Sequence, residues 1–111
     1  MTRCAAEKIH IGNGRLMLSL YVKGHANYAD NGKDIVCSAV SSLCTAFANT
    51  LLGYGVPKSC IRMKEGNFLV KAYIVENHKL CEGAFDMAVT GLRGIAEEYP
   101  DYVFCASGVS H

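Results

Sequence analysis

Residues 12–24, GNGRLMLSLYVKG, combine a turn with an extended segment that has one apolar face. The Gly-Asn-Gly sequence at residues 12–14 tolerates positive φ angles and so favours a tight turn between two strands. After this turn an aliphatic side chain recurs at every second position, which is the period of a strand. These positions are Leu16, Leu18, Leu20 and Val22. We therefore predict a hairpin, with residues 2–10 as its first strand.

A polar segment and then a helix are expected after the hairpin. Residues 26–33 are rich in Asn, Asp and Gly, a composition that favours a loop. Asp34 is a good N-cap, and apolar residues recur after it at helical spacing. The stripe that they form consists of Val36, Val40, Leu43, Phe47 and Leu51. We expect the helix to be ended by Gly53, Gly55 and Pro57.

The second half of the chain repeats this order of elements. Two extended runs, residues 61–64 and 68–75, are joined by a Glu-Gly-Asn sequence typical of a tight turn. Residues 78–98 then carry a second apolar stripe at helical spacing, which is weakened by three glycines and closed by a proline. Its members are Ala84, Ala88, Gly91, Ile95 and Tyr99. We expect a last strand over residues 102–105.

The predicted order, ββαββαβ, places the chain in the α+β class. Two helices would cover one face of a mainly antiparallel sheet, giving a two-layer sandwich. We expect a single domain over residues 1–111, because no linker, repeat or low-complexity segment interrupts the chain. The other face of the sheet needs cover as well, and a homodimer is one way to supply it.

The composition narrows the classes of function. Half of the 111 residues are apolar, which is enough for one modest core. The formal net charge of +1 argues against direct binding of nucleic acid through its phosphates. No apolar run reaches the ~20 residues needed to cross a bilayer, and residues 1–10 lack the hydrophobic stretch of a secretory signal. We therefore expect a cytoplasmic protein with no membrane partner.

The six cysteines are expected to be thiols. A chain without a secretory signal is not expected to carry disulfides, and Cys37 and Cys44 would lie about 10 Å apart along a helix axis, too far to bridge. The four histidines are scattered along the chain, so we predict no metal site and no cofactor. We assign packing roles to Cys44, Cys60, Cys81 and Cys105.

His25 and Cys37 are the best candidates for chemistry. His25 follows a predicted strand, and Cys37 lies in the first turn of the predicted helix, with a polar segment between them that is long enough to fold back. A helix N-terminus and a nearby imidazolium can lower a cysteine pKa from ~8.5 to between ~3.5 and 7.5. The spacing therefore allows an activated thiolate, although a cysteine or histidine of this kind more often has a structural role.

The segment around this pair resembles a known protease family. GHANYADNGKDIVCSAVS, residues 24–41, joins a GHA element to a G-x-D-[IV]-V-C element, as in the bacterial ribosomal-processing cysteine proteases. The resemblance implies that His25 and Cys37 form a catalytic dyad, with no third residue singled out to orient the histidine. It further implies an endopeptidase that supports ribosome assembly by removing the N-terminal extension of large-subunit ribosomal protein L27, after a hydrophobic, aromatic-containing motif.

Four neighbours of the dyad are candidate substrate-binding residues: Gly24, Asp34, Ser38 and Ser41. Ser38 departs from the alanine that is usual in the family, and we interpret it as a tolerated, solvent-facing change. Ser41 lies one helical turn after Cys37 and can touch the substrate, or it can bond its own helix backbone.

Two other classes of function remain open from the residues alone. A non-catalytic module that binds a ribosomal protein would have Cys37 buried and His25 in a structural role. An RNA-binding domain is less well supported, because the basic residues are spread along the chain and balanced by acidic ones.

Overall fold

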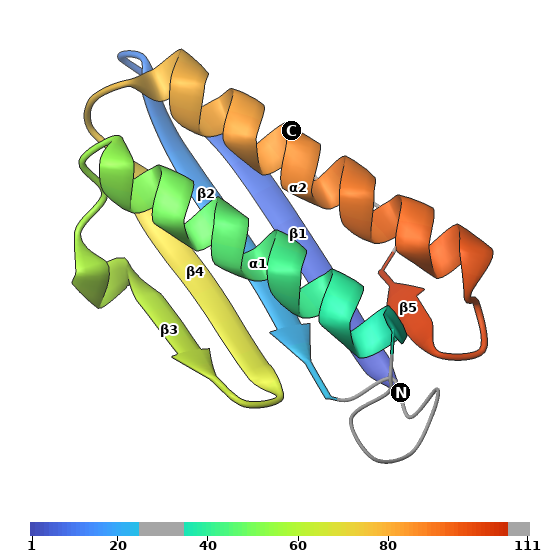
Figure 1. Cartoon of the computed structure of the whole chain (residues 1–111). Coiled ribbons are helices and arrows are strands. Elements are labelled where there is room, and N and C mark those ends of the chain that lie inside the picture. Colours follow the sequence, from blue (N-terminus) through green and yellow to red (C-terminus); the bar gives the residue numbers. More distant parts are fainter. Residues whose placement is uncertain (25–34, 107–111) are drawn as a thin grey trace.

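Two helices lie on the same face of one sheet in the computed structural model, which describes residues 1–24 and 35–106 (Figure 1). In chain order the elements are β1 (Thr2–Ile11), β2 (Arg15–Lys23), α1 (Ile35–Gly53), the short 3-10 helix η1 (Lys58–Cys60), β3 (Ile61–Lys64), β4 (Asn67–Ile74), α2 (His78–Glu98) and β5 (Val103–Cys105). The strand order is β3-β4-β2-β1-β5, and among the described strands only β1 and β5 pair in parallel. The α+β class and the predicted order of elements are confirmed.

The first hairpin forms as its sequence predicts. Asn13 and Gly14 adopt positive φ angles of 69° and 73° in the turn, which lets Ile11 pair with Arg15 across the two strands. The aliphatic side chains of β2 point toward the helices and are buried: Leu16, Leu18, Leu20 and Val22. The loop predicted at residues 26–33 and the N-cap predicted at Asp34 lie outside the described residues.

The apolar stripe of α1 packs on the sheet and is wider than predicted. Four of its five predicted members are buried, namely Val36, Val40, Phe47 and Leu51. Leu43 is half-buried at the edge of the stripe, whereas Cys44 and Ala48 are buried in addition. Cys44 has the packing role predicted for it, and Ala48 was missed because a single methyl group contributes little to an apolar pattern. Both side chains fit well where a helix approaches a sheet.

The length and composition of α1 also correct one expectation. The helix has 19 residues and a mean hydropathy of 1.7, which meet the requirements of a membrane span, contrary to the expectation that no segment would. A third of the tested window is buried inside the protein. Because the buried side chains of α1 belong to the hydrophobic core, packing on the sheet accounts for part of this apolar character.

Most of the predicted stripe of α2 packs against the core, but it is not the most buried part of the helix. Of its five members only Ala88 is fully buried, while Ala84, Ile95 and Tyr99 are partly buried against the core. The fully buried residues of α2 are Cys81, Phe85, Ala88, Val89 and Leu92. The prediction gave Gly91 and the two alanines the same weight as larger residues, whereas burial of Phe85, Val89 and Leu92 removes more apolar area from water. The ring of Phe85 meets that of Phe47 edge to face, with centroids 6.2 Å apart, so the two helices are in direct contact through these rings.

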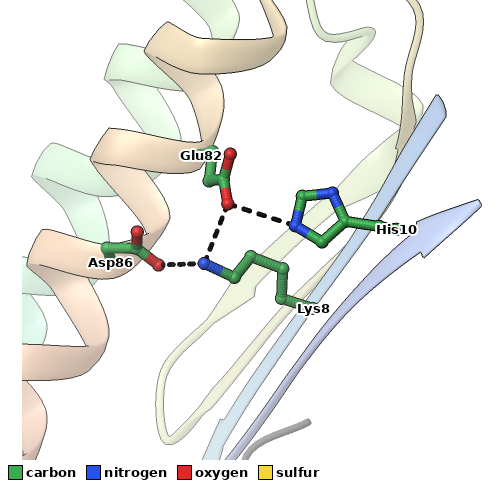
Figure 2. A network of polar contacts seen from close by, with 4 residues as sticks. All are labelled: Lys8, His10, Glu82 and Asp86. Atoms are coloured by element: carbon green, nitrogen blue, oxygen red, sulfur yellow. Dashed lines mark hydrogen bonds and ion pairs between the residues drawn. The ribbon is translucent and has the colours of Figure 1, made fainter. Parts of the chain in front are cut away.

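An ion-pair network joins β1 to α2 at the end of the sheet that carries the first hairpin turn (Figure 2). Lys8 Nζ lies 2.8 Å from Asp86 Oδ1 and 3.0 Å from Glu82 Oε2, and His10 Nε2 lies 3.3 Å from the same oxygen of Glu82. The Lys8 side chain is only 13% exposed. Hydrogen bonding from Lys8 lowers the pKa of Glu82, and hydrogen bonding to Asp86 raises the pKa of Lys8.

Candidate active site

A cavity of about 450 Å³ opens at the opposite end of the sheet, where the end of β2, the start of α1 and the turn between β3 and β4 meet (Figure 1). The described residues that line it come from β1, β2, α1 and the second hairpin: Thr2, Val22, Gly24, Cys37, Val40, Ser41, Cys44, Thr45 and residues 63–68. Its volume falls within the range of ligand-binding clefts. The lining combines an apolar floor with several hydroxyl and amide groups around it.

Cys37 lies in the first turn of α1, on the wall of this cavity. Its side chain is half-buried, and the residue is part of the lining of the cavity. The first-turn amides of a helix lack acceptors within the helix and stabilise negative charge near them. The position therefore suits a thiolate and the oxyanion that its attack on a carbonyl would create.

A second sulfur, Cys44, also lines the cavity and has the opposite character. Its side chain is buried in the core between α1 and the sheet. Burial raises the pKa of the Cys44 thiol to about 11, so this group stays protonated at neutral pH. Of the two cysteines in the cavity, Cys37 is therefore the candidate nucleophile, and the packing role predicted for Cys44 agrees with its burial.

Gly24 fixes the direction in which the chain leaves β2. Its φ angle is 97°, and a Cβ at this position would lie 2.5 Å from the carbonyl oxygen of Met1, so only glycine fits without distortion. The Gly24 amide donates to the Gly66 carbonyl at 2.9 Å, and the Thr2 hydroxyl donates to the Gly24 carbonyl at 3.4 Å. These bonds tie the end of β2 to the second hairpin and to the start of β1.

The remaining predicted site residues divide into three groups. Ser41 lines the cavity one turn after Cys37, whereas Ser38 is exposed and is not among the lining residues. His25 and Asp34 lie outside the described residues. The structure thus brings Gly24, Cys37 and Ser41 together.

Sequence reasoning missed a large part of the cavity wall. Thr45 follows Ser41 at the same helical spacing, so its place in the cavity wall could have been predicted from the sequence of α1. Thr2 and the turn around Gly66 approach Cys37 only because of the order in which the strands pair. No local signal in the sequence marks these residues, since their role depends on contacts between distant segments.

Comparison with known protein families gives one match, and comparison with curated proteins gives none. Residues 6–104 match the family described as cysteine protease Prp. The match spans β1 to β5 and includes Cys37.

Solved structures with the same fold include three from S. aureus and Streptococcus mutans. A ribosomal processing protease Prp from S. aureus, in complex with a covalently linked product peptide, is 19% identical with a TM-score of 0.76, and 100% of each chain is covered. The same S. aureus protease with a substrate peptide gives a TM-score of 0.71 at 19% identity, covering 96% of this chain and 98% of the other. SMU.848 from Streptococcus mutans is 24% identical with a TM-score of 0.73, covering 100% of this chain and 96% of the other.

Proposed function

The chain belongs to the family of the cysteine protease Prp, and from this membership we propose that it removes the N-terminal extension of ribosomal protein L27. In this proposal Cys37 is the nucleophile and His25 is the general acid and base. The cut would mature the ribosomal protein in the cytoplasm and so support ribosome assembly. The peptide complexes of the S. aureus relative, a ribosomal processing protease, support a peptide substrate here.

The observation that carries the proposal is the position of Cys37. It is the cysteine of the described chain that combines a helix first turn, partial exposure and a cavity large enough for several peptide groups. Burial raises the pKa values of Cys44 and Cys81. Cys60 lies in η1, which follows the C-terminal end of α1 and is far along the chain from its first turn. A binding module with a buried Cys37 agrees less well with this geometry.

The reaction is an acyl transfer in two steps. The Cys37 thiolate attacks the scissile carbonyl, and the negative charge that develops on the oxygen is stabilised by amides of the first turn of α1. His25 donates a proton to the leaving amine, and the acyl group remains on the sulfur as a thioester. A water molecule deprotonated by His25 then attacks the thioester, which releases the acid product and restores the thiol.

The cavity wall offers two kinds of contact to a bound peptide. Val40, Met63 and Phe68 provide apolar surface for a hydrophobic or aromatic side chain near the cut. Ser41 and Thr45 follow Cys37 along one side of α1, and their hydroxyl groups can hydrogen-bond to the peptide backbone. This combination agrees with a substrate whose cleavage motif is hydrophobic and contains aromatic residues.

Cleavage of the extended ribosomal protein by the purified chain tests the proposal. We expect the unaltered chain to cut, Cys37→Ala to show no measurable cleavage, and His25→Ala to be about 100- to 10,000-fold slower. Cys60→Ala and His10→Ala serve as matched controls, because Cys60 and His10 lie away from the cavity, and both should retain activity.

Native-rate cleavage by either dyad variant would exclude the proposed dyad. Mapping of iodoacetamide adducts near neutral pH distinguishes the protease from a binding module. Labelling of Cys37 well ahead of Cys60, which is also partly exposed, is expected for the protease, whereas poor labelling of Cys37 in a chain that binds the ribosomal protein without cutting it would identify the module.

A further inference from the structure

A second pair of sulfur atoms lies at the edge of the sheet, away from the candidate active site. Cys4 in β1 and Cys105 in β5 are direct partners in the parallel pairing of these strands. Both side chains are on the face that carries the helices, since Cys4 is buried in the core and Cys105 packs against it. The Ala106 amide donates to the Cys4 carbonyl at 2.9 Å and holds this register.

The spacing of the two cysteines suits a disulfide. Neighbouring strands lie about 4.8 Å apart, which is within the Cα separation of about 4.4–6.8 Å at which disulfides form. The side chains of Cys4 and Cys105 already share a hydrogen bond. All six cysteines of the structure are nevertheless present as thiols.

Within the described residues, Cys105 is the more exposed sulfur of the pair. Cys105 lines a surface depression of about 430 Å³ between α2 and β5, together with Arg93 and Phe104. Behind it, a cavity of about 10 Å³ is lined by Cys4, Cys105 and Arg93. Neither space shares a lining residue with the 450 Å³ cavity that contains Cys37. Because Cys4 is buried and Cys105 is half-buried, a small solute meets Cys105 first.

The electrostatic surroundings separate the roles of the two sulfurs. The hydrogen bond from Cys4 lowers the pKa of Cys105, and the positive charge of Arg93 lowers it further, although burial acts in the opposite direction. The same hydrogen bond and its own burial raise the pKa of Cys4. Cys105 is thus the sulfur that ionises, and Cys4 is the proton donor beside it.

We propose that Cys105 and Cys4 form a second reactive site, at which Cys105 reduces a hydroperoxide and Cys4 completes a disulfide between β5 and β1. The Cys105 thiolate attacks one oxygen of hydrogen peroxide, the O–O bond breaks, and hydroxide leaves as water after taking a proton. Cys105 is now a sulfenic acid. The Cys4 sulfur attacks it, and the hydroxyl group leaves as water with the Cys4 proton. Two thiols are oxidised and one peroxide is reduced to two waters.

Oxidation of the Cys37→Ala variant by one equivalent of hydrogen peroxide tests this site without interference from the candidate nucleophile. We expect each chain to lose two hydrogen atoms in its intact mass, and a non-reduced digest to contain one cross-linked peptide that joins Cys4 to Cys105. A further Cys105→Ser change should abolish the cross-link. Cys60→Ser is the matched control, because Cys60 is also partly exposed but lies in η1, and it should leave the cross-link intact.

A second measurement separates the two roles. In the Cys4→Ala variant the sulfenic acid on Cys105 has no partner and should be trapped by dimedone at Cys105 in preference to Cys60. Absence of the cross-link in the otherwise unaltered protein would overturn the proposal, and so would a cross-link between other cysteines. Equal trapping at Cys60 and Cys105 would also overturn it. The result does not depend on whether the chain cleaves its proposed substrate.

Discussion

At the scale of single residues, Gly24 shows how backbone geometry positions the candidate active site. We expect Gly24→Ala to lower the free energy of unfolding by about 1–3 kcal/mol, because alanine is strained at a φ of 97° and its Cβ would collide with the Met1 carbonyl. Relief of this collision would move the end of β2 and reduce cleavage. Denaturant unfolding and a cleavage assay measure the two effects.

Gly12→Ala is the control for this substitution. Gly12 lies in the turn of the first hairpin, and an added Cβ would meet no atom within 4 Å. Its free energy of unfolding should change by less than about 0.5 kcal/mol, with cleavage unaffected. Equal effects of the two substitutions would show that Gly24 has no special role.

Part of the site was predictable from the sequence, and the limit is physical. Cys37, Ser41 and Gly24 could be found because helical spacing and a strand end are local properties of the chain. Thr2 and the turn at residues 63–68 could not, since they reach the cavity only through pairing between strands far apart in sequence. Ser38 was included as a neighbour of Cys37, but on a helix the next residue points about 100° away.

At the scale of elements, the contact between α1 and α2 depends on Gly91. A Cβ at this position would lie 2.6 Å from Cδ2 of Leu43, so the end of this side chain must move to admit a larger residue. We expect Gly91→Ala to lower the free energy of unfolding by less than about 1 kcal/mol, because the cost of displacing Leu43 is partly offset by the usual gain of alanine in a helix. Thermal or denaturant unfolding measures the change.

Gly94 provides a matched control on the same helix. It is exposed, and a Cβ there meets no atom within 4 Å. Gly94→Ala should therefore raise the free energy of unfolding by about 0.5–1 kcal/mol, the usual gain of alanine over glycine in a helix. A gain at both positions would mean that the close approach at Gly91 is unimportant.

The ion-pair network of Lys8 makes the link between β1 and α2 dependent on pH. The pKa of Glu82 is lowered, so its contribution to stability is present above the ordinary value of about 4.3 and is lost as the pH falls through the lower folded value. The pKa of Lys8 is raised, so its contribution is present below about 10.4 and is lost as the pH rises through the folded value. The window of full stabilisation lies between these limits.

Lys8→Met should accordingly cost about 0.5–1 kcal/mol at neutral pH and almost nothing once the carboxyl groups of Glu82 and Asp86 are protonated. Unfolding by denaturant across a pH series gives this profile. Lys71→Met is the control, since Lys71 is on the opposite face of the sheet and makes no ion pair among the described residues. If the loss of stability caused by Lys8→Met were the same at every pH, packing of the Lys8 side chain and not its charge would explain the effect.

At the scale of the whole molecule, the face of the sheet away from the helices is the surface on which a homodimer is expected to form. A row of apolar side chains crosses this face, because Met17 pairs with Ile9 of β1 and with Tyr73 of β4. Tyr73 is 65% exposed in the isolated chain. We expect light scattering at micromolar concentration to give the mass of a dimer, and a monomeric mass would contradict this.

The variant Tyr73→Glu tests whether this row is the interface. A charge at its edge should shift the protein toward the monomer, because an unpaired charge is costly to bury between two chains. Met87→Glu is the comparison, since Met87 is also exposed but lies on α2, in the other layer. If Met87→Glu dissociated the dimer and Tyr73→Glu did not, the interface would lie on the helices and not on the sheet.

The parallel pairing of β1 with β5 has a consequence for how the molecule is made. Residues 2 and 103 are neighbours in the sheet, yet almost the whole chain separates them, whereas the other strand pairs of the described sheet close shorter loops. During synthesis the outer edge of β1 at residues 2–4 therefore stays uncovered while the other elements assemble. For that interval the nascent protein carries an open hydrogen-bonding edge, where a strand from a neighbouring chain can pair before its own does.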